Sequence, residues 1–391
     1  MLYRSLVAER IAETGGRSTG FDFLRIFLAV SVLCWHSVLS SYGVAQDVQG
    51  WAGPFRVFPS LVDVTFFALS GFLVAGSLER SRSLAEFSVL RALRLIPALS
   101  VQVCLSALIL GPIVTIYPLA EYFSQREFHR YWRSILGDIY YTLPGVYVTN
   151  PTNIVNISLW TIPFEIYCYI ALGLLALFSL ARKPKALILL FAAATVVFPL
   201  IHVHRNHGWF WGRIDGLVLV LSFTAGVLLF ALREKIVLKP AWALFSLISC
   251  SILLERPDLG FLAPLPAAYL TVYIGLANPP KNPILMSGDL SYGVYLYAFP
   301  IQQLFCWLFP MHRHWWLNIA FALPVTLTFA ALSWTFVERP ILTRKKTIIS
   351  LGRRAMRFFW RQGPAAEAAP LLPTAIPPHI SEPTLIKKSG R

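Results

Sequence analysis

Ionisable side chains inside apolar segments are the residues of this sequence that could do chemistry. The segment from Phe21 to Val38 reads FDFLRIFLAVSVLCWHSV and holds Asp22, Arg25 and His36 in an otherwise apolar run. Arg25 and His36 are eleven positions apart, which on an α-helix is about 16 Å of rise and about 20° from three whole turns. They therefore share one helix face, and Asp22 lies one turn before Arg25, where it can pair with it.

Two interpretations of this helix face are open. An arginine that faces lipid costs from about 2.5 to more than 10 kcal/mol, so a polar cavity along the face would explain both Arg25 and His36. Alternatively, Arg25 snorkels to the membrane surface and His36 is a core histidine with its hydrogen bonds satisfied.

Other polar residues favour the cavity. Glu165 lies early in the apolar segment NISLWTIPFEIYCYI, with Trp160 nearby, and we expect it at a depth comparable with that of His36. A buried carboxylate needs a partner or a proton, and His36 is one candidate partner; a structural pairing with another helix is the alternative. Arg91 and Arg94, in EFSVLRALRLIP, share a face and could clamp phosphate groups, although the general excess of basic residues near the cytoplasm would also place them there.

Composition indicates a membrane protein. The chain is 56% hydrophobic and 14% charged, whereas soluble domains average about 25% charged residues. The net charge of +15 falls in the connections between apolar segments, which indicates a lipid bilayer as the partner and not a nucleic acid. The five cysteines lie within apolar segments and have no C-x-x-C spacing, so they are expected to be small buried residues.

About ten segments are long enough to cross roughly 30 Å of hydrocarbon. We expect these spans at 21–42, 61–79, 93–117, 157–180, 186–203, 213–232, 240–254, 261–277, 288–309 and 315–337. Lys and Arg concentrate on the side of the N-terminus and of the basic C-terminus, which places both termini in the cytoplasm. The predicted fold class is therefore an all-α, polytopic integral membrane protein with about ten transmembrane helices and cytoplasmic N- and C-termini.

The predicted domain organisation has one membrane domain and two flanking regions. A cytoplasmic N-terminal segment spans residues 1–20, and the membrane domain spans 21–342. Residues 343–362 are predicted to form a basic interfacial helix. Residues 363–391 form a Pro/Ala-rich tail with few large apolar groups, and we expect it to be disordered.

Histidines near one outer connection invite a metal hypothesis. His202, His204 and His207 lie in the segment HVHRNHGWFWGR, but no carboxylate or cysteine accompanies them within it. We therefore predict no metal site. The aromatic residues of this segment and of the long loop 118–156 are interpreted mainly as interface anchors.

Several motifs together resemble the acyltransferase-3 family of membrane O-acyltransferases, which includes rhizobial and lipopolysaccharide-modifying O-acetyltransferases. FDFLRIFLAVSVLCWH is similar to the first-helix pattern of the family, an arginine and a histidine separated by ten residues. DVTFFALSGFLVAGSLERS with FSVLRALRLIPAL, SLWTIPFEIYCY, GDLSYGVYLYAFPIQQ and SWTFVERP are similar to the later blocks, in the same order. The resemblance covers about 20–342, with departures at Phe23, where Gly is common, and at YAFP, where many members have a Trp-His pair.

The resemblance implies an activity and a set of roles. It implies a ten-helix acyltransferase that takes acyl-CoA, usually acetyl-CoA, from the cytoplasm as a substrate, with no permanently bound cofactor. The acceptor would be a hydroxyl of an extracytoplasmic carbohydrate (exopolysaccharide, O-antigen or lipo-oligosaccharide), and the location the bacterial inner membrane. His36 would be a general base or carry the acyl group, Glu165 would orient His36, and Arg25, Arg91 and Arg94 would hold the phosphates of CoA. Weaker candidates for substrate contacts are Asp22, Ser70, Trp160 and Tyr292.

Two alternatives stay open at this point. Ser70 would either hydrogen-bond within the channel or be a small residue at a helix contact, and we favour the second. A proton-coupled secondary transporter would also carry buried Arg, His and Glu, although the sequence shows no obvious inverted repeat.

Overall fold

A computed structural model describes residues 5–16, 18–205, 214–280 and 288–350. The chain divides into two units, Met1–Lys345 and Lys346–Arg391. Of the second unit only residues 346–350 are described, and they are helical. The predicted basic helix at 343–362 therefore lies mostly outside the described residues, and the tail at 363–391 lies entirely outside them.

The first unit is a bundle of long helices joined by short ones. Each of the ten predicted spans overlaps one helix of 12 residues or more: α2 (Thr19–Tyr42), α4 (Val57–Arg80), α5 (Leu84–Leu105), α9 (Ile162–Leu177), α10 (Pro184–Arg205), α11 (Gly216–Ala231), α12 (Pro240–Glu255), α13 (Pro264–Gly275), α15 (Ser291–Leu308) and α16 (Trp315–Ser333). The shorter helices are α1 (Val7–Glu13), α3 (Val44–Gly50), α6 (Gly111–Val114), α7 (Leu119–Ser124), α8 (Arg126–Tyr131) and α17 (Arg339–Thr343).

Six helical segments of the described chain are long and apolar enough to cross a membrane. They are Thr19–Tyr42, Gly53–Arg80, Leu84–Val114, Ile157–Leu177, Pro184–His204 and Trp315–Thr343. Helices α11, α12 and α13 have 16, 16 and 12 residues, and α15 carries two glutamines, Gln302 and Gln303. The helical fold and the membrane-spanning character are thus as predicted, whereas the count of ten and the orientation stay predictions.

One small sheet departs from the all-helical expectation. Strand β1 (Ser5–Leu6) pairs antiparallel with β2 (Val237–Leu238), with Ser5 opposite Leu238. The pair ties the segment before α1 to the connection between α11 and α12, more than 230 positions along the chain.

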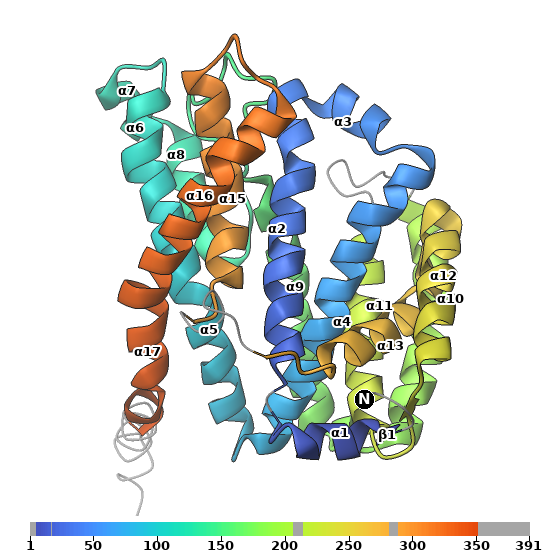
Figure 1. Ribbon diagram of the computed structural model, residues 1–391. Helices are drawn as coiled ribbons and strands as arrows, with labels where there is room; N and C mark the ends of the chain where they lie inside the picture. Colours follow the sequence, from blue (N-terminus) through green and yellow to red (C-terminus); the bar gives the residue numbers. More distant parts are fainter. Residues whose placement is uncertain (1–4, 17, 206–213, 281–287, 351–391) are drawn as a thin grey trace, which may run out of the picture. The chain divides into compact units, whose positions relative to one another are not determined.

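Helix α2 lies in the middle of the first unit. In Figure 1 it stands between α15 and α16 on one side and α4, α11 and α13 on the other. It begins after Ser18, whose hydroxyl accepts a hydrogen bond from the backbone N–H of Gly20 at 3.4 Å. It ends at Gly43, which has a φ of 87° that favours glycine. Most of its side chains are buried, among them His36, so His36 faces protein, whereas Asp22 near the start of the helix is exposed.

Helices α4 and α11 approach each other closely because two glycines lie at their contact. A Cβ atom at Gly71 would lie 2.0 Å from the carbonyl oxygen of Phe223, and one at Gly226 would lie 2.1 Å from that of Ala68. Small residues allow such backbone approach between membrane helices. This contact fixes α4, which carries several residues of the site described below.

The helix α9 starts deep in the bundle. A 3₁₀ turn, Ile157–Thr161, precedes it and is capped by Asn156, whose side-chain oxygen accepts from the N–H of Ser158 at 3.1 Å. Before that turn the non-helical chain is itself buried at Ile154 and Val155. Irregular backbone is tolerated at membrane depth where protein surrounds it, so this segment occupies the space in which α9 would otherwise begin.

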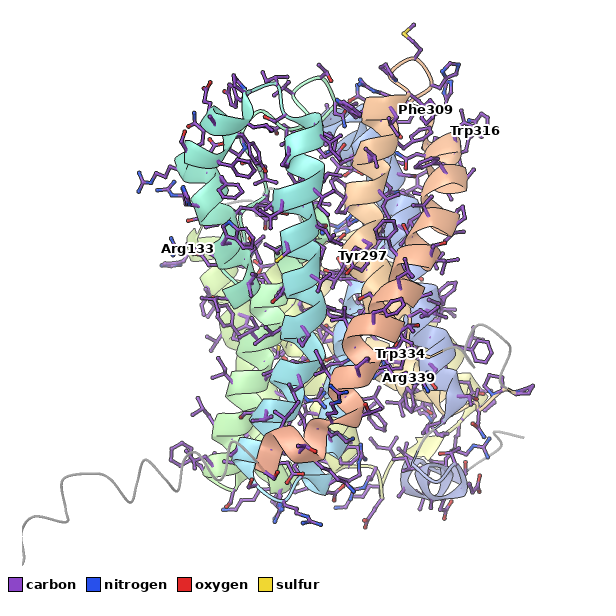
Figure 2. All side chains as sticks on the ribbon, turned by 90° about the vertical axis from the view of Figure 1, so that its left-hand side faces the viewer. Arg133, Tyr297, Phe309, Trp316, Trp334 and Arg339 are labelled. Carbon is purple, nitrogen blue, oxygen red and sulfur yellow. The ribbon has the colours of Figure 1, made fainter. Side chains whose placement is uncertain are left out.

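Helices α15 and α16 form an antiparallel pair. Figure 2 shows Phe309 and Trp316 toward one end of this pair and Trp334 and Arg339 toward the other. Between them, the ring of Tyr297 lies 5.9 Å from that of Phe329, measured between centroids. Helix α16 continues through a π-helical turn, Trp334–Glu338, into α17.

Candidate active site

Helices α2, α4, α5, α9 and α15 surround a cavity of about 450 Å³. Its lining is mixed, with aromatic and aliphatic side chains between charged and hydroxyl groups. We call one part its basic end, lined by Asp22, Arg25, Arg80, Arg91 and Arg94. We call the opposite part its inner end, lined by Val32, Asp63, Phe66, Thr161 and Tyr295. A cavity of this size, apolar with a few convergent polar groups, is typical of a small-molecule site.

Two arginines of the basic end share one carboxylate. Arg25 Nη1 lies 3.1 Å from Asp289 Oδ2, and Arg94 is ion-paired with the same oxygen. Arg94 also lies 3.5 Å from Glu338 Oε2, which the π-helical turn after α16 brings inward. Asp22 pairs with Arg25 as predicted, at 3.9 Å. Arg25 and Arg94 are therefore held by carboxylates of the chain itself.

Arg91 has different surroundings. Its Nη2 donates to Ser77 Oγ at 3.1 Å, and its guanidinium carbon lies 5.9 Å from the ring centroids of both Phe87 and Tyr169. No carboxylate lies in ion-pair range of Arg91 within the described chain. Its buried Nε also has no hydrogen-bond partner there. Of the two arginines on α5, Arg91 is therefore the one that no carboxylate of the described chain pairs with, whereas Arg94 is paired with Asp289.

His36 lies behind the inner end of the cavity. It is 5% exposed, and its ring meets those of Trp35 and Phe299 edge-on, at 5.1 and 5.5 Å between centroids. Ser158 Oγ is 3.4 Å from His36 Nδ1. His36 is not among the residues that line the cavity, whereas Val32, one turn before it on α2, is.

A short chain of hydrogen bonds connects the inner end to this histidine. The phenol of Tyr295 is 2.6 Å from Thr161 Oγ1, and both side chains line the cavity. The same phenol donates to the backbone carbonyl of Ser158, and the Ser158 hydroxyl faces His36. Polar contacts thus run from the cavity wall to the imidazole.

Glu165 belongs to the basic end, which corrects its predicted depth. The phenol of Tyr169, one turn further along α9, donates to its carboxylate, and the guanidinium groups of Arg94, Arg91 and Arg25 act on its charge. From Ser158, beside His36, to Glu165 the chain runs through the 3₁₀ turn and one turn of α-helix, about 12 Å. The expected equal depth was wrong because α9 begins further into the bundle than a helix starting at the membrane surface would.

The weaker candidates divide into two groups. Tyr292 lines the cavity, with its hydroxyl donating to the carbonyl of Leu95 at 2.9 Å and its ring 5.8 Å from the Arg94 guanidinium carbon. Ser70 also lines the cavity; the helix contact that we favoured for it is made by its neighbour Gly71. Trp160 does not line the cavity and instead packs in the apolar core.

Sequence reasoning missed seven residues of the site: Asp63, Ser158, Thr161, Tyr169, Asp289, Tyr295 and Glu338. Asp63 is an acidic residue inside a predicted span, and the rule that singled out Glu165 applies to it equally. Asp289 and Glu338 lie in two of the motifs that resemble the family, GDLSYG and FVERP. They were not singled out because both lie next to predicted helix ends, where charged residues are common.

The structure describes only part of the histidine segment that had suggested a metal site. His202 is paired with Asp215. This carboxylate lies two residues after the segment HVHRNHGWFWGR, which itself has no carboxylate. His207 lies outside the described residues. Among the described residues no group of three or more His, Cys, Asp or Glu could hold a metal ion.

Several apolar helices of membrane-spanning length, with a cavity among them that has arginines at one end, are typical of a multi-pass membrane protein. Residues 18–338 match the acyltransferase domain family, acyltransferase 3. The chain belongs to this family and is an acyltransferase, which favours an enzyme over the transporter.

Two relatives extend over most of the chain. An O-acetyl transferase of Shigella phage Sf6 is 26% identical over 344 residues, which is 86% of this chain and 99% of that protein. Nodulation protein 10 of Rhizobium leguminosarum bv. viciae is 27% identical over 367 residues, which is 86% of this chain and 97% of that protein. No solved structure matches the chain.

Proposed function

We propose that this protein is an O-acetyltransferase that moves an acetyl group from acyl-CoA on the cytoplasmic side of the bacterial inner membrane to a carbohydrate hydroxyl on the other side. Exopolysaccharide, O-antigen and lipo-oligosaccharide are the acceptor classes of this proposal. The observation that carries it is the cavity, which joins cationic groups at one end to ionisable groups next to His36 at the other. The name of the phage relative supports acetyl as the transferred group.

The donor would bind with its charged part at the basic end. CoA carries phosphates, and a guanidinium group binds phosphate through charge-assisted hydrogen bonds. Arg91 is the principal phosphate ligand in this proposal, because it lines the cavity and no carboxylate of the described chain is in ion-pair range of it, whereas Arg25 and Arg94 are paired with Asp289. The slender pantetheine arm would then extend along the apolar lining and bring the thioester to the inner end.

The transfer step would take place at the inner end. His36 takes the proton of the acceptor hydroxyl as general base while the hydroxyl oxygen attacks the thioester carbonyl carbon. Ser158, beside Nδ1, positions the imidazole. Thr161 has a hydroxyl group on the cavity wall that can turn to donate a hydrogen bond to the oxygen on which negative charge develops. The phenol of Tyr295 uses its own proton on the carbonyl of Ser158 and can accept from Thr161. In the alternative relay, His36 itself carries the acyl group before passing it on.

The proposed topology has ten spans, with both termini in the cytoplasm and the domain boundaries given above. The basic end of the cavity lies at the same end of the bundle as α1 and the start of α2, which this topology assigns to the cytoplasm. Aromatic side chains toward both ends of the α15–α16 pair (Figure 2) support membrane boundaries there, because Trp and Tyr gather at both interfaces.

Two measurements test the proposal. Purified protein in detergent should release free CoA slowly from acetyl-CoA even without acceptor, whereas a transporter releases none. Mass spectrometry of surface and secreted glycans, from cells with and without the gene, should give a difference of one acetyl group per repeat unit. A protein that releases no CoA and leaves every glycan mass unchanged is not this enzyme.

A further inference from the structure

Asp63 is a carboxylate of the cavity for which the proposed mechanism has no role so far. It lies on α4 within an apolar helix, its residue is 8% exposed, and it lines the inner end. Burying a carboxylate within an apolar helix costs free energy, and such residues usually mark functional sites in membrane proteins. Its position along the bundle indicates which function that is.

Asp63 and His36 lie at the same depth. On α4, Ser77 is level with Arg91, to which it is hydrogen-bonded at 3.1 Å. Asp63 is fourteen residues earlier in the same helix, about 21 Å away. Arg94 is three residues after Arg91 on α5, about 4.5 Å further toward the inner end.

On α2 the reference residue is Arg25, which is taken to be level with Arg94 because both pair with Asp289. His36 lies about 16 Å further along α2 than Arg25. Adding the rise from Arg91 to Arg94 on α5 places His36 about 20 Å from the level of Arg91. Helices α2 and α4 are in contact. Asp63 and His36 thus lie within about one helical turn of the same level on adjacent helices.

Tyr295 connects the two residues. The Asp63 carboxylate acts electrostatically on the Tyr295 phenol, and that phenol donates to the backbone of Ser158, whose hydroxyl faces His36. Glu165 also acts on that phenol, but it lies about 12 Å nearer the basic end, among arginines and Tyr169. Of these two carboxylates, Asp63 is therefore the one at the depth of His36.

We propose that Asp63 is a positioning residue for acyl transfer, whose charge stabilises the protonated form of His36. This proposal rests on the proposed function. When the hydroxyl oxygen bonds to the thioester carbon, its proton passes to His36 and the imidazole becomes positively charged. The carbon–sulfur bond then breaks, the sulfur leaves with the electron pair, and His36 returns the proton to it. Asp63 would lower the energy of the charged intermediate state, as an anion at close range does.

A double-mutant cycle tests this role. Asp63→Asn should lower kcat about 10- to 150-fold, the loss expected for one interaction with a charged group, while KM and direct binding of acetyl-CoA stay within about threefold. If Asp63 acts through His36, Asp63→Asn combined with His36→Gln should be no slower than His36→Gln alone, within about twofold. Radiolabelled acetyl-CoA gives the sensitivity that the slow variants need.

Matched variants separate this role from a structural one. Asp138→Asn removes a carboxylate from an exposed pair with Arg133 and should change nothing. Glu165→Gln should instead change KM, because Glu165 lies among the arginines. Should Asp63→Asn fail to insert, Asp63→Glu, which keeps the charge and moves it by one methylene, should insert, bind acetyl-CoA normally and show a reduced kcat.

The outcomes divide clearly. Two results would overturn the role of Asp63 and leave the acyltransferase proposal standing. The first is a turnover of Asp63→Asn within threefold of wild type. The second is a double variant whose loss of kcat equals the product of the losses of Asp63→Asn and His36→Gln. Full kcat in Asp63→Glu would overturn it as well. A wild-type protein that neither releases CoA nor acylates a glycan would overturn both.

Discussion

Replacing Arg91 and Arg94 one at a time should have different effects, although the sequence presents them as an equivalent pair. Arg94 is ion-paired to Asp289 and lies 3.5 Å from Glu338, whose side chain is 3% exposed. Arg94→Ala would leave both carboxylates without this cation. Breaking a buried ion pair from one side typically costs about 3–5 kcal/mol. We therefore expect Arg94→Ala to lower the unfolding temperature sharply and to lose acetyl-CoA binding as a consequence.

Arg91→Ala removes much less from the fold. Within the chain it loses its hydrogen bond to Ser77, worth about 0.5–1.5 kcal/mol, and its contacts with Phe87 and Tyr169, but no ion pair. A charge-assisted hydrogen bond to a phosphate is worth about 1.5–3 kcal/mol, or about 10- to 150-fold in affinity. Arg91→Ala should accordingly raise the KM for acetyl-CoA by that factor with kcat nearly unchanged, because a binding residue contributes equally before and during the reaction.

The assay compares both variants in one detergent preparation by thermal unfolding, direct acetyl-CoA binding and steady-state kinetics. Arg133→Ala is the control, since Arg133 is exposed and makes a surface pair of little worth. The reasoning is refuted if Arg94→Ala loses acetyl-CoA affinity at an unchanged unfolding temperature. It is refuted equally if Arg91→Ala binds acetyl-CoA like wild type.

Three further predictions concern the catalytic base, the helix contact and the tail. His36→Gln keeps a polar side chain but cannot take a proton near neutral pH, so acylated product per inserted protein should fall about 10²–10⁴-fold, with acetyl-CoA binding retained; more than a tenth of wild-type turnover would make His36 structural. Gly71→Ala places a methyl group against the carbonyl of Phe223 and should cost about 1–3 kcal/mol or more, measured by thermal unfolding, whereas Gly173→Ala, with no heavy atom within 4 Å of the new Cβ, should be neutral or stabilising. Deleting residues 363–391 should leave membrane insertion and acylation intact, as followed by fractionation and product mass, because this composition has no core to lose.

Much of the fold could be predicted because its signal is local. Apolar runs located the helices, six of which in the described chain are long and apolar enough to cross a membrane. The pairing of Asp22 with Arg25 followed from their spacing within one helix. The ionisable residues inside apolar segments led to one cavity, because burying such groups in lipid is costly. All of these inferences depend on neighbours in the sequence.

What could not be predicted depends on partners far apart in the chain. Asp289 bridges two arginines from other helices, one of them 264 positions away, and spacing carries no information about such a contact. The depth of Glu165 was missed for a related reason, since buried non-helical chain before Ile157 fills the outer part of that space. Asp63 differs from both, because the sequence places it inside an apolar span and therefore predicts its burial. The residue that it acts on could not be predicted from the sequence.

The pairing of β1 with β2 has a consequence for how the chain is made. A ribosome adds about 5–20 residues per second, so Val237 and Leu238 follow Ser5 and Leu6 after about 12 to 46 seconds. Throughout that time the first strand has no edge to pair with, although α2 directly behind it can already enter the bilayer. Strand β1 therefore reaches its native pairing only after the chain as far as β2 has been made, and its docking reports that α11 and the turn behind it are in position.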